Sequence, residues 1–121
     1  MTLNKSKFSV FKNFSYAFHG LREVFRNETA FKIEVITFVI CQVVIFSVPI
    51  VITAKAILSI SVILPLLAEL ANSAIERTVD LVTMEYDEKA KAAKDAGSAL
   101  VLLSLILTSV IWIWTAFFFI F

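Results

Sequence analysis

Four polar side chains recur on one face of an otherwise apolar segment. They are Glu69, Asn72, Glu76 and Asp80, spaced by three, four and four residues. At about 100° per residue this spacing places them in one narrow arc of a helix. A carboxylate at membrane depth costs about 2.5–3.5 kcal/mol on insertion scales. That cost favours a functional role for Glu69, and the alternative is a structural hydrogen bond between helices.

A second acidic stretch, RNETAFKIE, contains Asn27, Glu28 and Glu34. Mg²⁺ is commonly held by one or two carboxylates together with substrate phosphates and water. Glu28 and Glu76 could supply such a partial shell if the fold brings the two stretches together. Spacing alone does not bring them together.

A third polar stretch, KAAKDAGS, contains Lys91, Lys94, Asp95 and Ser98. A lysine in this stretch could neutralise phosphate charge. The only glycines of the chain are Gly20 and Gly97, which excludes both a P-loop and the glycine-rich loop of protein kinases. ATP, if bound, is therefore held in an uncommon way.

The segments that position these residues are apolar enough to need lipid. The chain has 121 residues, of which 60% are hydrophobic, and its mean hydropathy is +0.89. Charge is absent from residues 35–54 and 96–121, and a helix needs about 20 apolar residues to cross a membrane. We predict an all-α membrane protein with one domain over residues 1–121 and three spans, at about 33–48, 54–75 and 97–120. The middle span is long enough only if it includes Glu69 and Asn72.

The N-terminal residues predict an amphipathic surface helix at about 5–26. Its aromatic and aliphatic residues recur at intervals of three and four, with lysines and arginines between them: Phe11, Phe14, Phe18, Leu21 and Phe25. This pattern suits the membrane interface, where the helix could also serve only as an anchor. We expect no cleaved signal peptide, because no early apolar region is present.

The lysines and arginines predict the orientation in the membrane. They gather before the first span and between the second and third spans, and Lys55 stands alone on the opposite side. The positive-inside rule then places the N-terminus in the cytoplasm. Lys55 could reach toward lipid head groups or contact a lipid substrate, and the sequence leaves both open.

Four motifs occur in order along the chain: NETAFKIE, E-x-x-NSAIE-x-x-VD, EY and AKDAGSA. With their span lengths and the size of the chain, they closely resemble the prokaryotic diacylglycerol kinase family over nearly the whole sequence. The resemblance implies a bacterial inner-membrane homotrimer with active sites between subunits. It also implies transfer of the γ-phosphate of ATP, with Mg²⁺ as cofactor, to diacylglycerol.

The resemblance also implies roles for individual residues. Glu69 resembles the general base, and Glu28 and Glu76 resemble the metal-holding pair, supported by Asp80 and Glu34. The residues that it implies for ATP binding are Tyr16, Glu28, Asn72, Glu76, Glu85, Tyr86, Asp87, Lys94 and Asp95. Those that it implies for lipid-substrate binding are Glu69, Lys55 and Ser98.

Two other functions remain open from the sequence. An undecaprenol kinase of the same fold would use the same carboxylates, and a non-enzymatic membrane subunit or ion-pathway protein could line a path with Glu69.

The sequence departs from the family pattern where the family often has arginine, tryptophan or histidine. These positions are Ser9, Phe18, Phe25 and Asp87.

Overall fold

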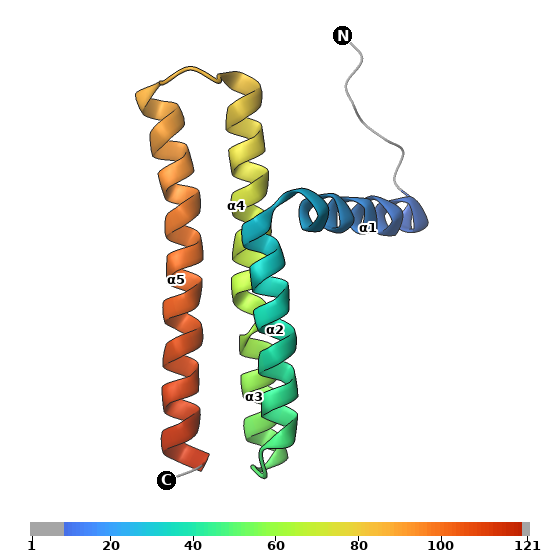
Figure 1. Ribbon diagram of the computed structural model, residues 1–121, viewed down its shortest axis with the longest axis vertical. Coiled ribbons are helices and arrows are strands. Elements are labelled where there is room, and N and C mark those ends of the chain that lie inside the picture. Colours follow the sequence, from blue (N-terminus) through green and yellow to red (C-terminus); the bar gives the residue numbers. More distant parts are fainter. Residues whose placement is uncertain (1–8, 120–121) are drawn as a thin grey trace.

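The computed structural model describes residues 9–119 and is built entirely from helices over that range. The helices are α1 Val10–Asn27, α2 Thr29–Ser47, α3 Ile52–Ser61, α4 Ile63–Val82 and α5 Glu88–Phe119. Figure 1 shows α2, the α3–α4 pair and α5 running side by side, with α1 extending sideways from the start of α2, away from the bundle. Three helical segments are long and apolar enough to cross a membrane, at Thr29–Ser47, Ile52–Val82 and Glu88–Phe119. The prediction of three spans is confirmed.

The helices extend beyond the predicted spans on the side of the α4–α5 turn. The second span continues to Val82 rather than ending near residue 75, and the third starts at Glu88 rather than near Gly97. Asp87 explains the early start of α5, because its Oδ1 accepts hydrogen bonds from the backbone N–H groups of Lys89 and Ala90, each at 2.9 Å. Such a side-chain cap satisfies amides that have no partner within the helix. The predicted bounds are those of apolar membrane crossings, and the helices continue past them into polar sequence.

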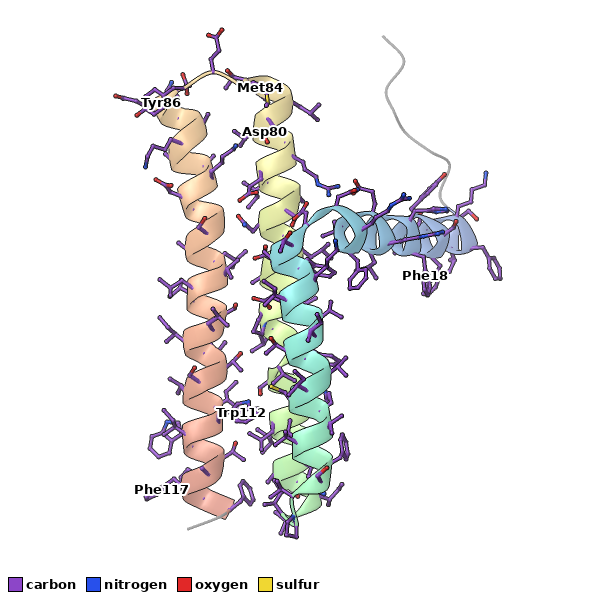
Figure 2. The ribbon with its side chains drawn as sticks, viewed as in Figure 1. Phe18, Asp80, Met84, Tyr86, Trp112 and Phe117 are labelled. Atoms are coloured by element: carbon purple, nitrogen blue, oxygen red, sulfur yellow. The ribbon has the colours of Figure 1, made fainter. Side chains whose placement is uncertain are left out.

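The middle span, predicted as one helix, is interrupted at Val62. Pro65 has no N–H, so the carbonyl of Ser61 loses its partner one turn along the helix. The hydroxyl of Thr108 on α5 donates to that carbonyl at 3.2 Å, and Nε1 of Trp112 donates to Ser61 Oγ at 3.0 Å. Trp112 lies in the half of the bundle away from the α4–α5 turn (Figure 2). Polar groups of α5 therefore compensate for the break.

Several polar side chains of this chain are buried, while many large apolar ones are exposed, unlike the pattern in a water-soluble protein. Glu69, Asn72 and Ser73 are only 7%, 8% and 1% exposed, whereas Ile33 and Leu67 are 59% and 58% exposed. Large exposed apolar surfaces require an apolar environment or a partner. The buried polar side chains and the largely apolar exterior agree with three helices surrounded by lipid.

α1 is attached to the rest of the chain at one end. It meets α2 at an elbow centred on Glu28, whose backbone is extended, with φ −113° and ψ 119°. Val24 is the only buried residue of α1. Residues 5–8 of the predicted surface helix, and residue 120 of the predicted third span, lie outside the described residues.

Candidate active site

The buried polar face of α4 is packed against α5 at Gly97. Asn72 Nδ2 donates to Glu76 Oε1 at 3.1 Å. A Cβ added to Gly97 would overlap Asn72 Oδ1 and would lie 3.4 Å from its Cγ. Glycine therefore permits the close approach of α5 that encloses Asn72.

Four carboxylates gather around this face, and we call them the acidic cluster: Glu28, Glu34, Glu69 and Glu76. Glu69 lies within the range of electrostatic interaction of the other three. Glu28 and Glu34 come from the elbow and the start of α2, while Glu69 and Glu76 come from α4. The fold thus brings together the two acidic stretches that spacing alone could not join.

Glu28 is held by two residues of α4. Arg77 Nε and NH2 donate to Glu28 Oε1 at 3.0 and 2.7 Å, and Ser73 Oγ donates to Glu28 Oε2. The remaining Arg77 nitrogen, NH1, donates to Glu23 of α1. Hydrogen bonds from Arg77 and Asn27 lower the pKa of Glu23 below its usual value.

Sequence reasoning missed Ser73, Arg77 and Glu23 as members of this site. One signal was present, since Arg77 is the only basic residue between Lys55 and Lys89. It also lies one helical turn beyond Ser73, so that both side chains point from the same face of α4. A lone arginine on a face with carboxylates indicates an ion pair.

The oxygen atoms at this site fit a partial Mg²⁺ shell. Within residues 9–119 no group of three or more His, Cys, Asp or Glu side chains is arranged to hold a metal, but Mg²⁺ needs only one or two carboxylates beside substrate phosphates. Three donors occupy Glu28, which leaves one of its roughly four lone-pair sites. In the described chain, Asn72 Oδ1 is buried without a hydrogen-bond partner. Asn72 Oδ1 and one acceptor site of Glu28 therefore remain available beside Glu76 as hard oxygen ligands.

A separate polar cavity of about 270 Å³ lies where α4 turns into α5. Lys94 Nζ lies 2.6 Å from Asp80 Oδ1, and Lys91 Nζ lies 2.5 Å from Asp95 Oδ2. Figure 2 shows Asp80 and Tyr86 at this end of the bundle. Six residues singled out from the sequence line the cavity: Asp80, Glu85, Tyr86, Asp87, Lys94 and Asp95. Lys91, which the sequence offered as a second lysine for phosphate charge, also lines the cavity, as do Thr83 and Met84, which sequence reasoning did not assign.

Other candidate residues lie apart from this cavity. Tyr16 is exposed on α1, Ser98 is exposed on α5, and Glu34 lines an apolar cavity of about 540 Å³ between α2 and α5. Lys55 Nζ donates to the carbonyl of Phe46 at 3.0 Å and lies 5.8 Å from the centre of the Phe46 ring. At 1.5 Å per residue, Lys55 is about 21 Å from Glu69 along the middle span. Within one chain, Lys55 therefore lies far from the acidic cluster.

Comparison with known proteins gives one consistent family. The family described as Prokaryotic diacylglycerol kinase matches residues 15–116. The diacylglycerol kinase of Escherichia coli (strain K12) is 34% identical over 111 residues, which cover 89% of this chain and 91% of the relative. That of Pseudomonas aeruginosa is 37% identical over 97 residues, covering 80% and 79%. That of Helicobacter pylori (strain 26695) is 34% identical over 103 residues, covering 85% and 80%.

Proposed function

This chain belongs to the prokaryotic diacylglycerol kinase family, and we propose that it transfers the γ-phosphate of ATP to diacylglycerol, giving phosphatidic acid. It is a multi-pass bacterial membrane protein with three apolar spans. The single observation that carries the proposal beyond family membership is the position of Glu69. Glu69 is 7% exposed on an apolar span and lies on the same helix as Asp80, which lines the polar cavity. A lipid hydroxyl and a water-soluble nucleotide must meet at such a boundary.

In the proposed reaction Glu69 is the general base. Its carboxylate accepts the proton of the primary hydroxyl of diacylglycerol while the hydroxyl oxygen attacks the γ-phosphorus of ATP. A new phosphorus–oxygen bond forms, the bond to the β-phosphate oxygen breaks, and ADP leaves. The low exposure of Glu69 keeps water away from the attacking position, which favours the lipid over hydrolysis.

The nucleotide is held by groups at the α4–α5 turn in this proposal. The ammonium group of Lys94 opposes the negative charge of the phosphates, and its contact with Asp80 holds the side chain in place. Glu85, Tyr86, Asp87 and Asp95 line the same cavity. This assignment explains how a chain without a glycine-rich phosphate loop can bind ATP.

Glu28 and Glu76, with Asn72 beside them, are the proposed holders of Mg²⁺. The ion, when bound, offsets charge on the phosphate oxygens. Asn72 fixes the carboxylate of Glu76 through its hydrogen bond, and Arg77 and Ser73 fix that of Glu28. These contacts limit the orientations that either carboxylate can adopt.

The proposed assembly is a homotrimer in the bacterial inner membrane, with the N-terminus in the cytoplasm and α1 as an amphipathic helix at the interface. Phe14 and Phe18 of α1 are 65% and 72% exposed, and Phe18 points toward the side on which the spans run (Figure 2). Both features suit a helix that lies on lipid. Active sites between subunits would bring Tyr16 and Ser98 of neighbouring chains to positions that they do not reach within one chain.

The test is a competition between lipid substrates. Purified protein in vesicles receives radiolabelled ATP with equal amounts of diacylglycerol and undecaprenol, and the Glu69→Gln variant controls for contaminating kinases. We expect labelled phosphatidic acid. Preferential labelling of undecaprenol would show that undecaprenol, rather than diacylglycerol, is the substrate. Absence of phosphate transfer to either lipid would favour a non-enzymatic role.

A further inference from the structure

The attachment of α1 to the bundle depends on few apolar contacts. Val24 is the only buried residue of this helix, and α1 extends away from α2 beyond the elbow (Figure 1). Buried apolar area is the usual source of packing energy between helices. One buried valine supplies little of it, so other contacts must determine the angle at the elbow.

Arg77 provides a link from α4 to both sides of the elbow. Its Nε and NH2 bind Glu28 at the elbow, and its NH1 binds Glu23, one turn earlier on α1. Glu23 is itself fixed, because its Oε1 accepts from Asn27 Nδ2 at 2.8 Å. The planar guanidinium therefore joins two carboxylates that belong to α1 and to the elbow.

We propose that Arg77 is a positioning residue that sets the angle between α1 and α2 and, through it, the orientation of the Glu28 carboxylate. Glu28 has little freedom while Arg77 occupies Oε1 and Ser73 occupies Oε2. The remaining acceptor site of Glu28 is then presented in one direction. The part of the proposal that concerns α1 does not depend on the kinase activity, whereas the part that concerns Mg²⁺ rests on the proposed function.

The exposure of these side chains determines whether loss of Arg77 should affect global stability or only the local structure. The Arg77 and Glu23 side chains are 41% and 50% exposed, whereas that of Glu28 is 24% exposed. Exposed ion pairs contribute little to global stability, so the whole fold does not depend on Arg77. Its effect is local, because two carboxylates and three N–H groups constrain one short elbow.

The proposed positioning role also requires arginine rather than another cationic side chain. Arginine presents several N–H groups in a rigid plane and can bind two acceptors in fixed directions, whereas lysine offers a compact charge on a flexible stem. Arg77→Lys therefore keeps the positive charge but removes the rigid planar set of N–H donors. This substitution separates positioning from simple electrostatics.

The first experiment measures the position of α1 directly. Spin labels are placed at Lys12→Cys and Leu81→Cys in a Cys41→Ser background, and labelled chains are diluted with unlabelled chains so that distances within one chain dominate. We expect one narrow distance distribution in the parent and a clearly broader one with Arg77→Gln. Arg26→Gln is the matched control, since Arg26 lies in α1 but enters none of the four ion pairs between described residues. An equally narrow distribution in Arg77→Gln would overturn the proposal.

The second experiment measures metal binding and activity with Arg77→Lys. Loss of a residue that orients a metal ligand typically weakens metal affinity by about 10–100-fold, so we expect at least a tenfold rise in the Mg²⁺ concentration for half-maximal kinase activity. The KM for diacylglycerol should stay unchanged. Binding of Mn²⁺ with ATP, followed by electron paramagnetic resonance, should weaken in parallel and does not require turnover.

The outcomes separate the two proposals. Parental Mn²⁺ binding in Arg77→Lys would show that only the charge matters and would overturn the orienting role. If the parent protein lacked kinase activity but bound Mn²⁺ and ATP, the proposed function would fail, while the distance and binding measurements would still test Arg77.

Discussion

The two halves of the bundle are held together by different kinds of contact. The half that includes α1, the elbow and the α4–α5 turn contains the acidic cluster and four ion pairs between described residues. The other half, around α3 and the end of α5, has Lys55 as its one charged residue. We call them the charged half and the neutral half.

The neutral half uses uncharged polar groups to join its helices. Ser59 Oγ donates to Gln42 Oε1 at 2.5 Å, and Gln42 Nε2 donates to the Ser59 carbonyl at 3.2 Å. Together with the contacts of Ser61, these bonds link α3 to both α2 and α5. Such bonds satisfy polar groups in lipid without desolvating a charge. The charged half retains carboxylates that are costly to bury, which supports the role in catalysis proposed for them.

The largest expected effect is at Glu69. Glu69→Gln keeps the size of the side chain and its burial but removes the proposed base, and a general base typically contributes about 10²–10⁴-fold to a rate. We expect kcat to fall by about that factor, while the proposed homotrimer still forms in detergent. Radiolabelled phosphatidic acid formed per unit time is the measurement.

Glu88→Gln is the matched control for Glu69→Gln. Glu88 lies in the first turn of α5 and is exposed, so the same chemical change there should leave kcat unaltered. Full activity in Glu69→Gln would show that Glu69 is not the base. The proposed functional difference between the charged half and the neutral half would then lose its main support.

The next effect is at the contact between α4 and α5. Gly97→Ala should gain about 1 kcal/mol of helix propensity but pushes a methyl group against Asn72. Displacement of Asn72 frees Glu76, and a misplacement of about 1 Å can cost about 10²-fold in rate. We therefore expect kcat/KM to fall by about 10–100-fold without a matching loss of stability.

Gly20→Ala makes the same chemical change where there is space. Among the described residues, no heavy atom outside the local helix backbone lies within 4 Å of a Cβ at Gly20, so activity should be retained in this exposed helix. If Gly97→Ala were as active as Gly20→Ala, the close approach at Asn72 would have no role in the reaction.

The sequence predicted the positions of the spans better than their ends. Absence of charge located the first and third membrane segments, because lipid excludes charges regardless of detailed packing, and the middle segment reached a sufficient length only by including Glu69. It could not locate the start of α5, since the cap at Asp87 depends on the local backbone. Nor could it find the break at Val62, because Pro65 alone does not reveal whether another helix supplies a replacement donor.

The candidate site was predictable in part for a related reason. Helical spacing placed Glu69, Asn72 and Glu76 on one face, and the structure agrees. The contacts of Glu28 with Ser73 and Arg77 join residues far apart in the chain, and no periodicity within one helix encodes them. The resemblance to the family named Glu28 but did not point to Arg77.

A smaller effect is expected in the neutral half. Trp112→Phe keeps the aromatic packing but removes the N–H that binds Ser61, and hydrogen bonds within membranes average about 0.6 kcal/mol, with a maximum of about 1.7. We expect a loss of unfolding free energy in that range, measured by denaturation in detergent, with unchanged kinase activity. Trp114→Phe is the control, since Trp114 is 54% exposed and should cost less. A large loss of activity in Trp112→Phe alone would show that the neutral half also takes part in the reaction.

The smallest effect is expected at Lys55, where the resemblance and the geometry differ. The family implies a substrate contact, yet the Lys55 ammonium binds the carbonyl of Phe46, about 21 Å from Glu69 at 1.5 Å per residue. Lys55→Met keeps most of the apolar stem and removes the charge, so we expect an unchanged KM for diacylglycerol and a slight loss of stability from the unpaired carbonyl. A KM that rises severalfold, with kcat preserved, would instead show that the far end of the span contacts the lipid substrate. In that case the neutral half would help to bind the substrate, and chemistry would no longer be confined to the charged half.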